Sequence, residues 1–573
     1  YWPVAYHDLT APIDAPLRRA WLPRHRLVKR DRTKAASAPL DAIVYHVDRG
    51  APEPVRTALL EGARSWERLF EAAGFPGGFR VELLPEGADP HDLRYNVIQW
   101  VNRSTRGWSY GETITDPRTG EILKGHVTLG ALRVRQDLLL AQGLLGDAGD
   151  PRAMEMALAR IRQLAAHEVG HTLGLEHNFA ASTQDRASVM DYPAPHVALA
   201  PDGALDLSHA YAEGCGAWDE WVIRYGYGDF EHTEDGATPA QREARGLAAL
   251  LAEADTRGLV YLSDEAARGN DRAHPLANLW DDGPDPVEGL AHAVDVRRAA
   301  LARFSPAALA PGRALAELEE VLVPLYLHHR YQLEACVRAL GGVEYGYETN
   351  DGTPRGTQPV AAERQRRALT LALGTLTPQF LALPESLRAL IPPRPPGSAP
   401  HRELSRPDAL LFDPLALGAT GIELTLALLL DPARCTRLVD QHAADVDQPG
   451  FDDLVDALAA AGWTDAAGDP AGDGTSAALR GELRWGVARH LMRLAADEEL
   501  APRLREPAWR ALMRIGEADL SGPLLRGTIA RFAEDPARVL PTLETPRIPP
   551  GSPIGCGGPD ELPAFLAGNG GQR

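Results

Sequence analysis

The first 130 residues alternate between short apolar segments and turn signals, the pattern of a β-sheet with helices packed on it. A helical spacing of apolar residues runs from Val55 to Phe70, and Gly74 supplies a stop signal. Segments with strand composition lie on either side of this helix, at 41–48, 80–85, 95–101 and 121–130. The order strand–helix–strand–strand–strand predicts a mixed sheet with helices on its face.

The rest of the chain has a helical pattern, which begins near Met154, continues through Leu175 and returns in almost every segment beyond residue 210. Loops rich in Pro and Gly interrupt it at 264–287, 346–360, 392–408 and 464–476. We therefore expect an α/β (α+β) fold, with a mixed twisted sheet and a long helix from about Met154, followed by a large, mainly α-helical region.

The expected domains follow from these changes of pattern and from the length of 573 residues, which exceeds one core. We predict an α/β domain at 41–209, a helical domain at 210–400 and a C-terminal helical domain at 401–573. Residues 1–40, rich in Pro and Arg, are interpreted as a linker or the remnant of an upstream domain.

Composition excludes several function classes. The net charge of −20 argues against a nucleic-acid-binding face, and no lysine is followed by Ser or Thr as a phosphate-binding P-loop requires. The most apolar run, 415–430, contains Glu423 and is shorter than a membrane span, so we expect a buried helix. The four cysteines are widely spaced, which argues against a cysteine metal site and leaves one or two disulfides open.

The candidate chemistry is concentrated in the stretch HEVGHTLGLEH at 167–177. On a helix, His167 and His171 lie about 40° apart around the axis, so both imidazoles face one point, as in many zinc sites. Glu168 lies beside them, close enough to reach a metal-bound water but poorly placed as a ligand. We assign it the role of general base.

A third ligand, His177, requires the helix to end. In a continuous helix it would lie roughly 15 Å along the axis from His167, too far to share an ion. Gly174 can adopt a positive φ and turn the chain back. We therefore predict one Zn²⁺ ion held by His167, His171 and His177, and attribute Gly170 to close packing.

Downstream, SVMDY at 188–192 predicts a tight turn. Met190 would give the three imidazoles a polarizable apolar floor. Tyr192 could place its hydroxyl near the metal, as a ligand at rest or as a donor to the developing oxyanion. Asn178 could orient the ligand loop or only cap its turn, and the sequence leaves both roles open.

These motifs resemble the zinc motif and Met-turn of the metzincins, the clan of astacins, serralysins and matrix metalloproteases. More closely, the chain is similar to a bacterial family of large zinc-dependent metalloproteases with a Met-zincin domain. The stretches that resemble this family cover nearly all of residues 40–556 and include AIVYHVDRGAPEPVRTALLEGARSWERLFEAAGF, DPRTGEI, HEVGHTLGLEHNF, WDEWVIRYGYG, VPLYLHHRYQLEA, FDPL and PPGSPIG.

The resemblance implies a metzincin-like fold, peptide-bond hydrolysis and a Tyr192 that approaches the metal. It implies that 41–209 is the catalytic domain and that the helical domain at 210–400 completes or flanks its active-site cleft. It also implies that the strand at 121–130 is the sheet edge above the zinc, where a peptide substrate could add as another strand. Family members usually carry a signal peptide and an upstream β-rich domain. We therefore expect export to the periplasm, cell envelope or exterior, and interpret the start at Tyr1 as a processed or truncated product.

Other residues of the sequence could also bind a metal or contact the substrate. His328 and His329 could join Glu334 in a second metal site, but adjacent histidines face different sides of a helix, so one packed and one solvated ring is favoured. Asp185 and Asp191 are alternative ligands that need more assumptions than His177. His126, on the predicted edge strand, could contact substrate, although simple exposure is the default.

We predict a zinc-dependent endopeptidase that acts on proteins or peptides, with neither a nucleic-acid partner nor a membrane span. The oligomeric state stays open. Two other classes are a metal-dependent hydrolase of a non-peptide amide, and a scaffold protein whose helical half does the work while its zinc site is vestigial.

Overall fold

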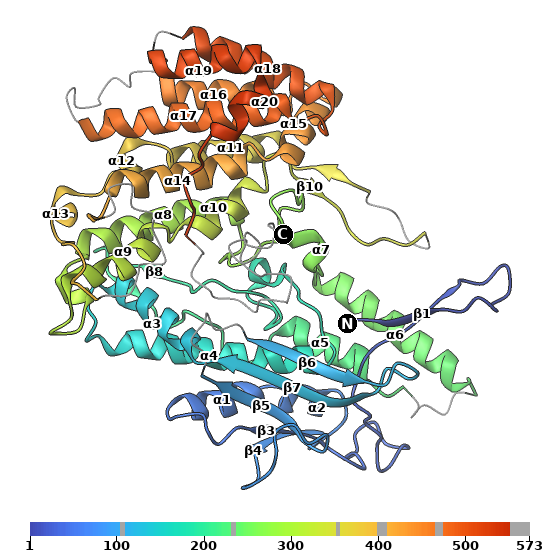
Figure 1. Ribbon diagram of the computed structural model, residues 1–573. Coiled ribbons are helices and arrows are strands. Elements are labelled where there is room, and N and C mark those ends of the chain that lie inside the picture. Colours follow the sequence, from blue (N-terminus) through green and yellow to red (C-terminus); the bar gives the residue numbers. More distant parts are fainter. Residues whose placement is uncertain are drawn as a thin grey trace, which may run out of the picture.

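The computed structural model describes residues 1–102, 109–230, 236–350, 356–397, 410–463, 474–518 and 520–549. A five-stranded sheet with helices against it forms one end of the molecule, and layers of helices extend from it to the other end (Figure 1). Residues 464–473 of the predicted loop at 464–476, and 398–408 of the one at 392–408, lie outside the described residues. The end of the first loop was predicted wrongly, because a helix begins at Gly474.

The sheet has the strand order β4-β3-β5-β7-β6. Its strands are β3 (Ile43–Val47), β4 (Phe79–Leu83), β5 (Asn96–Val101), β6 (Tyr110–Thr115) and β7 (Ile122–Gly130). Four strands are parallel, and β6 pairs antiparallel with β7. The sequence predicted these four strands and a mixed sheet, but not which strands are parallel. It was wrong about the edge, because β6 covers β7 and itself ends the sheet.

Three helices cover one face of the sheet, α1 (Val55–Arg64), α2 (Glu67–Ala72) and α4 (Pro151–Thr172). The apolar stripe predicted from Val55 to Phe70 is buried throughout, but the single predicted helix is broken at Ser65 and Trp66 into α1 and α2. A further helix, α3 (Leu132–Leu145), packs on α4 and was not predicted.

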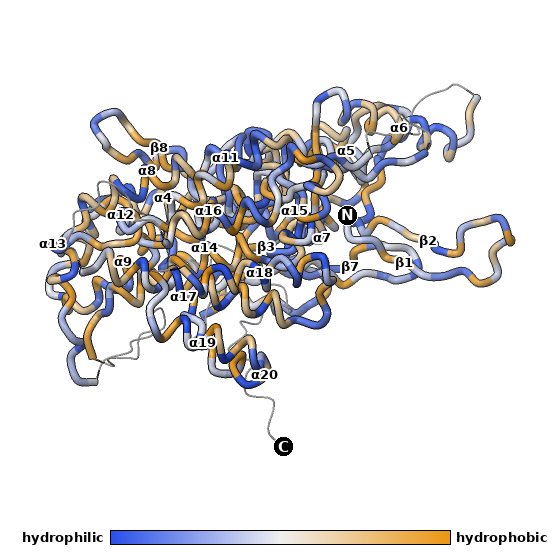
Figure 2. The backbone as a smooth tube through the Cα atoms, turned by 90° about the horizontal axis from the view of Figure 1, so that it is seen from above, coloured by the Kyte–Doolittle hydropathy of each residue, from blue (hydrophilic) through white to orange (hydrophobic). Residues whose placement is uncertain are grey.

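Residues 1–40 include a hairpin of β1 (Val4–His7) and β2 (Arg18–Trp21), which extends beyond the body of the molecule (Figure 2). The chain on both sides of this hairpin packs on α5 (Ala217–Tyr227). The Tyr1 hydroxyl donates to the Val222 carbonyl at 2.9 Å, and Arg24 donates to the Gly226 carbonyl at 2.7 Å. The proposed division into domains, including the linker, stays a prediction.

Helices dominate the chain after residue 210. Their bounds are α6 Pro239–Arg257, α7 Asp264–Ala267, α8 Pro286–Arg303, α9 Leu318–Tyr326, α10 Arg330–Val337, α11 Ala362–Gly374, α12 Pro378–Leu381, α13 Glu385–Arg388, α14 Pro414–Leu429, α15 Pro432–Ala444, α16 Phe451–Trp463, α17 Gly474–Ala496, α18 Pro502–Glu517, α19 Pro523–Glu534 and α20 Pro536–Val539. Two short pairs accompany them, β8 (Ala198–Leu199) with β9 (Leu205–Asp206), and β10 (Val343–Glu344) with β11 (Gln358–Pro359).

The buried apolar residues form two clusters. The first contains the sheet, α4 and residues of α8 and α9, and the second joins the later helices between Val287 and Val539. Residues of α8 and α9 therefore belong to the same hydrophobic core as the sheet.

Within the described part of the chain, no single helix is long and apolar enough to cross a membrane, while α14 and α15, bent by 46°, pass that test together. Cys215, Cys336 and Cys435 are free and buried, and Cys556 lies outside the described residues.

Candidate metal centre

The metal centre is built on the last turns of α4. The helix starts at Pro151, where the Asp150 side chain accepts a hydrogen bond from the Arg152 amide, and ends at Thr172. Gly174 follows with a φ of +96°. A side chain at Gly174 would put its Cβ 2.1 Å from the Pro23 carbonyl oxygen, so this turn needs glycine for both its backbone conformation and its close packing.

The turn at Gly174 brings the third histidine back to the other two, as predicted. The Nε2 atom of His171 lies 3.1 Å from that of His167 and 3.2 Å from that of His177. Among the described residues, these three form the one group of His, Cys, Asp or Glu able to hold a metal ion.

Each imidazole is held by a hydrogen bond at its other nitrogen. Nδ1 of His167 lies 2.6 Å from the Val189 carbonyl, and Nδ1 of His171 lies 2.9 Å from the Leu175 carbonyl. Nδ1 of His177 lies 2.7 Å from Oδ2 of Asp264. Because these partners accept, each Nδ1 carries the hydrogen and each Nε2 presents a lone pair to the common centre.

This donor set fits zinc. Three lone pairs that face one point repel one another unless a cation lies between them. Tetrahedral ligands at zinc–nitrogen distances of ~2.0–2.1 Å are roughly 3.3 Å apart, close to the separations here. Burial lowers the pKa of His171 to about 3, with His177 adding to the effect, and burial holds the pKa of His167 well below its usual range. Both rings therefore stay neutral, as metal ligands must be.

Met190 packs against α4 and explains a second glycine. A Cβ added to Gly170 would approach the Met190 sulfur to 2.2 Å and the Trp66 ring to 3.0 Å. Met190 and Trp66 are fully buried. Gly170 is thus required by packing, as the sequence predicted, since the turn that carries Met190 lies directly against α4.

A buried carboxylate on α5 holds that turn in place. Asp219 accepts hydrogen bonds from the Ser188 hydroxyl at 2.6 Å, the Val189 amide at 2.9 Å and the Gly216 amide at 2.7 Å. Burial raises the pKa of Asp219 to about 6, although these hydrogen bonds oppose the rise. Because the Val189 carbonyl accepts from His167, Asp219 positions the first histidine through the turn.

Asn178 both caps its turn and orients the loop. Its Oδ1 accepts from the Ala180 amide at 3.3 Å and from the Leu262 amide at 3.2 Å, and its Nδ2 donates to the Val260 carbonyl at 2.9 Å. The two roles left open by the sequence are therefore combined. Asn178 ties the loop after His177 to the segment that leads into α7.

Tyr192 lies against the histidines inside an aromatic cluster. Its ring centroid is 4.7 Å from that of His177 and 5.4 Å from that of His167, and it stacks on Trp280 at 4.6 Å. Nη2 of Arg268 donates to the Tyr192 hydroxyl oxygen at 3.2 Å. Arg268 also pairs with Asp264, the acceptor for His177. A continuous polar chain therefore runs from His177 through Asp264 and Arg268 to Tyr192.

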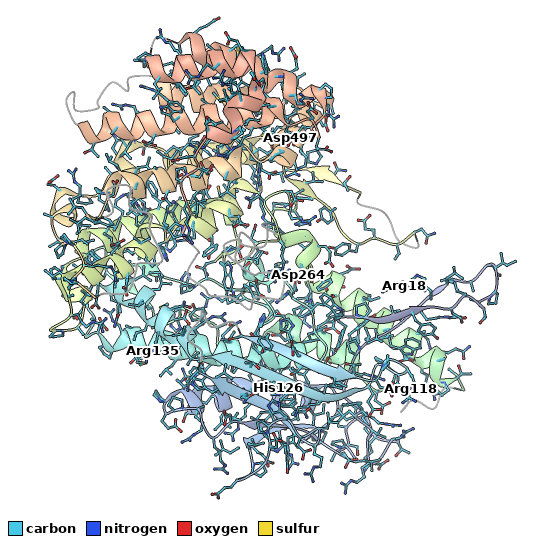
Figure 3. The ribbon with its side chains drawn as sticks, in the orientation of Figure 1. Arg18, Arg118, His126, Arg135, Asp264 and Asp497 are labelled. Carbon is cyan, nitrogen blue, oxygen red and sulfur yellow. The ribbon has the colours of Figure 1, made fainter. Side chains whose placement is uncertain are left out.

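Asp264 is ionised in this chain of contacts. Burial opposes its ionisation, but the hydrogen bond from His177 and the charge of Arg268 together hold the pKa of Asp264 well below its usual range. Figure 3 places Asp264 between the sheet that carries His126 and the helices that end near Asp497. The helical region thus supplies a charged acceptor to the metal centre.

Glu168 is fully buried next to His167 on α4. The edge strand β6 lies against the same turn, since a Cβ on Gly111 would meet the Glu168 carbonyl oxygen at 2.4 Å and the His171 Cβ at 3.0 Å. The sheet edge and the metal centre are therefore neighbours.

Comparison with known families decides the assignment. A family model described as Met-zincin matches residues 149–469, more than half of the chain. The chain belongs to the Met-zincin family. Membership indicates a zinc metallopeptidase, in agreement with the three converging histidines. No curated protein and no solved structure matches the chain.

The other candidate ligands of this Met-zincin lie elsewhere. His329 is buried against Phe380 with ring centroids 4.7 Å apart, Glu334 pairs with Arg338, and His328 lines a separate pocket. Asp185 is exposed. The Asp191 carboxylate accepts from the Ser182 and Tyr192 amides. His126 is on β7 inside the sheet, 3.1 Å from Oε1 of Gln99, so its predicted position on an edge strand was wrong. It is half-buried, and its contact with substrate stays a prediction.

Sequence reasoning missed Asp219, Asp264, Arg268 and Trp280. Asp219 is part of WDEWVIRYGYG, a stretch noted only for its resemblance to the family. Asp264 lies 87 residues beyond His177 inside a predicted loop, and no spacing rule connects the two. Only the fold brings them together.

Proposed function

We propose that this Met-zincin is a zinc-dependent endopeptidase in which His167, His171 and His177 hold the metal and Glu168 is the general base. The observation that carries the proposal is the convergence of three Nε2 lone pairs on one point, with each Nδ1 fixed by an acceptor. A zinc ion held there would polarise a peptide carbonyl and lower the pKa of water toward 7.

Glu168 is proposed to move the proton. It follows His167 on α4 and is fully buried, so its carboxylate acts in a site of low dielectric. In the proposed reaction it accepts a proton from the attacking water and delivers it to the leaving amine nitrogen.

Tyr192 is proposed to donate its hydroxyl hydrogen to the developing oxyanion. Arg268 donates to the phenol oxygen and lies over the Tyr192 ring, 5.5 Å from its centroid. A cation hydrogen-bonded to the oxygen makes the O–H group a stronger donor.

A peptide substrate is proposed to extend the sheet at β6. This strand replaces the predicted one at 121–130, because β7 is already paired on both sides. Gly111 brings β6 onto the turn that holds Glu168 and His171. A peptide paired with β6 would therefore run past the metal centre while its main chain makes ladder hydrogen bonds.

The test is cleavage of casein with and without a chelator, combined with metal analysis of the purified protein. We expect one bound zinc per chain, casein cleavage, and its loss on chelation. Glu168→Gln should retain zinc and lose cleavage by at least about 100-fold, the lower end of a general base's contribution. Glu155→Gln, an exposed change on the same helix, is the matched control.

The outcomes separate the alternatives. Unchanged cleavage by Glu168→Gln would remove the assigned base. Cleavage of small amides but not of casein would favour a hydrolase of non-peptide amides, and zinc binding without any hydrolysis would favour a scaffold. Export stays a proposal based on family resemblance, which fractionation of the producing cells would test.

A further inference from the structure

Trp280 has an unfavourable backbone conformation next to the metal centre. Its φ is +65°, a left-handed value that a bulky residue rarely adopts. In the described part of the chain, the residues other than glycine with a positive φ are Asp185, Arg186 and Trp280. Strain of this kind persists only where the surrounding structure imposes it, and it is concentrated at functional sites. Trp280 is therefore a candidate for a role beyond packing.

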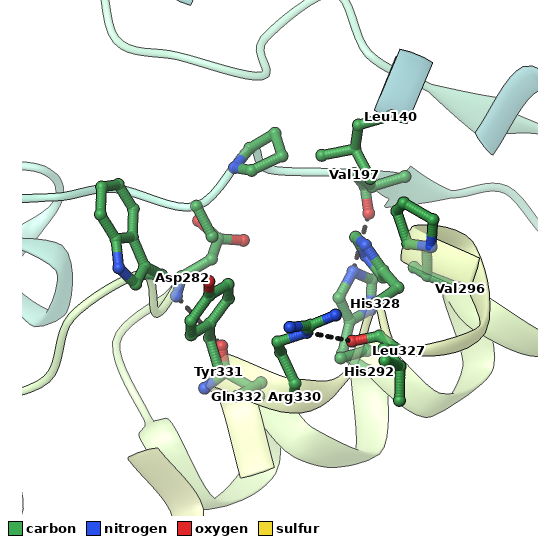
Figure 4. Close-up of a pocket in the computed structure, with 16 residues that line it drawn as sticks. Leu140, Val197, Asp282, His292, Val296, Leu327, His328, Arg330, Tyr331 and Gln332 are labelled. Atoms are coloured by element: carbon green, nitrogen blue, oxygen red, sulfur yellow. Dashed lines mark hydrogen bonds between the residues drawn. The ribbon is translucent and has the colours of Figure 1, made fainter. Parts of the chain in front are cut away.

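Hydrogen bonds to two other parts of the fold hold Trp280 and the residues after it in place. The Trp280 amide donates to the Tyr192 carbonyl at 2.8 Å. Two residues later, the Asp282 amide donates to Oε1 of Gln332 on α10 at 3.1 Å (Figure 4). The strained residue is thus fixed between the turn that carries Tyr192 and the helical half of the molecule.

This conformation puts the indole ring against the ring of Tyr192. The two ring centroids are 4.6 Å apart, and the ring planes differ by 22°. Phe179 and His177 meet the phenol ring edge to face, at centroid distances of 5.3 Å and 4.7 Å. Tyr192 is only 1% exposed. Moving its phenol to a second position would therefore break contacts with three aromatic side chains.

We propose that Trp280 is a positioning residue, which holds Tyr192 in the one orientation from which its hydroxyl donates to the developing oxyanion. The inference rests on the proposed function. A donor that is already aimed needs no reorganisation when the charge forms, and a misplacement of about 1 Å can lower a rate roughly 100-fold. The helical half thus contributes to catalysis through the residue that stacks on Tyr192.

A double-mutant cycle on the zinc-loaded protein tests this role with a peptide taken from casein. Trp280→Leu should lower kcat by about 10- to 100-fold, and Tyr192→Phe by at least as much, because the loss of one oxyanion donor sets the limit. In the Tyr192→Phe background, Trp280→Leu should change kcat by less than about twofold, since it then has no donor to position. Trp280→Phe, which keeps a ring for stacking, should recover most of the kcat.

Binding of a phosphinic peptide provides a readout without cleavage, because its tetrahedral phosphinate imitates the oxyanion. By calorimetry, Trp280→Leu should weaken this binding at least about fivefold when Tyr192 is present and less than about twofold with Tyr192→Phe. Zinc affinity, measured by competition with a chelator, should stay the same, since each imidazole keeps its own acceptor.

Two further variants separate positioning from stability. Trp280→Gly removes the ring but suits the positive φ, so kcat should fall as in Trp280→Leu even though the backbone strain is relieved. Trp509→Leu is the matched control, because Trp509 packs on Phe532 in the second core with ring centroids 5.5 Å apart. It should lower stability in urea and leave both kcat and phosphinate binding unchanged.

The outcomes distinguish this inference from the proposed function. An unchanged kcat in Trp280→Leu, or an equal loss with and without the Tyr192 hydroxyl, would overturn the positioning role. An effect confined to KM would also overturn it, because Trp280 lines a pocket and would then act on the substrate directly. Absence of all cleavage by the wild type, with the coupling kept in phosphinate binding, would overturn the proposed function and leave the positioning of Tyr192 intact.

Discussion

At the scale of single residues, the three histidines differ in what holds them. His167 and His171 are fixed by α4 and donate to backbone carbonyls, whereas His177 comes from a loop and donates to the Asp264 carboxylate. A carboxylate acceptor both orients an imidazole and raises its basicity. The ligand with the least support from its own backbone thus has the strongest partner.

Replacing Asp264 tests that support. Asp264→Asn keeps an acceptor for His177 but removes the charge and weakens the pairing with Arg268, so we expect zinc affinity to fall by roughly 10- to 100-fold. Competition with a chromogenic chelator measures the affinity. Asp255→Asn, an exposed change on α6, should have no effect. Equal zinc affinity in wild type and Asp264→Asn would show that the carboxylate does not tune the site.

Gly174 tests whether the returning turn depends on one residue. Gly174→Ala combines an unfavourable φ with a contact of 2.1 Å to the Pro23 carbonyl oxygen. We expect a loss of about 2–6 kcal/mol in the free energy of unfolding, the sum of backbone strain and overpacking. Gly87→Ala is the control, since Gly87 also has a positive φ but nothing within 4 Å of the added Cβ. Urea unfolding of both variants should give a much smaller loss for Gly87→Ala.

At the scale of elements, the sequence predicted those with a strong apolar pattern, whether the buried residues alternate, as in β4, or are nearly continuous, as in β3. The strands β3, β4, β5 and β7 and the helix α4 belong to this group. The edge strand β6, YGETIT, has a mixed polar pattern and is positioned by the contact of Gly111 with α4. Helix α3 was missed because it packs on α4, α8 and α9, so that its apolar residues surround the axis.

The candidate site likewise contains residues that the local sequence predicts and others that only the fold brings together. The histidines, Gly174 and Met190 are close in sequence, so the spacing alone indicated how they converge. Asp219 accepts a hydrogen bond from the Val189 amide, 30 residues away in the sequence, and Asp264 accepts one from His177, 87 residues away. Such pairs depend on how α5 and α7 pack, which local pattern does not encode.

Asp219 gives the turn that carries Met190 a pH-dependent support. Its pKa of about 6 in the folded protein exceeds the ordinary value of 3.8. Above pH 6 the buried carboxylate costs stability, and below pH 3.8 that cost is absent. As pH falls through this window, Asp219 should therefore stabilise the fold by up to about 3 kcal/mol.

Asp219→Asn should remove this pH dependence and leave donors on the turn unsatisfied, which costs about 1–3 kcal/mol at neutral pH. Urea unfolding of both chelator-treated proteins at pH 7.5 and pH 4.5 measures the difference, which should be larger at pH 4.5. Glu220→Gln, the neighbouring residue on α5, serves as the control. A difference that is the same at both pH values would contradict the shifted pKa.

At the scale of the whole molecule, the helical half helps to build the metal centre. Helix α7 brings Asp264 and Arg268 to the histidines, and the buried side chain of Arg338 on the chain after α10 anchors it. Arg338 donates to the Ala277 carbonyl at 2.6 Å, the Ala266 carbonyl at 3.3 Å and the Gly269 carbonyl at 3.3 Å. The packing of Arg338 therefore helps to position α7, which carries Asp264.

Arg338→Met tests this coupling. It removes the donor to several carbonyls around α7 while keeping a long apolar side chain, so α7 should lose its anchor and Asp264 its fixed distance to His177. We expect a lower melting temperature and, in the protein that remains folded, a zinc affinity at least about threefold weaker, as expected for a residue that acts through the support of a ligand. Arg489→Met is the matched control, because Arg489 is also buried but pairs with Glu423 in the second core. Both variants should be less stable, but only Arg338→Met should weaken zinc binding. Equal zinc affinities would mean that the helical half stabilises the fold without shaping the metal centre.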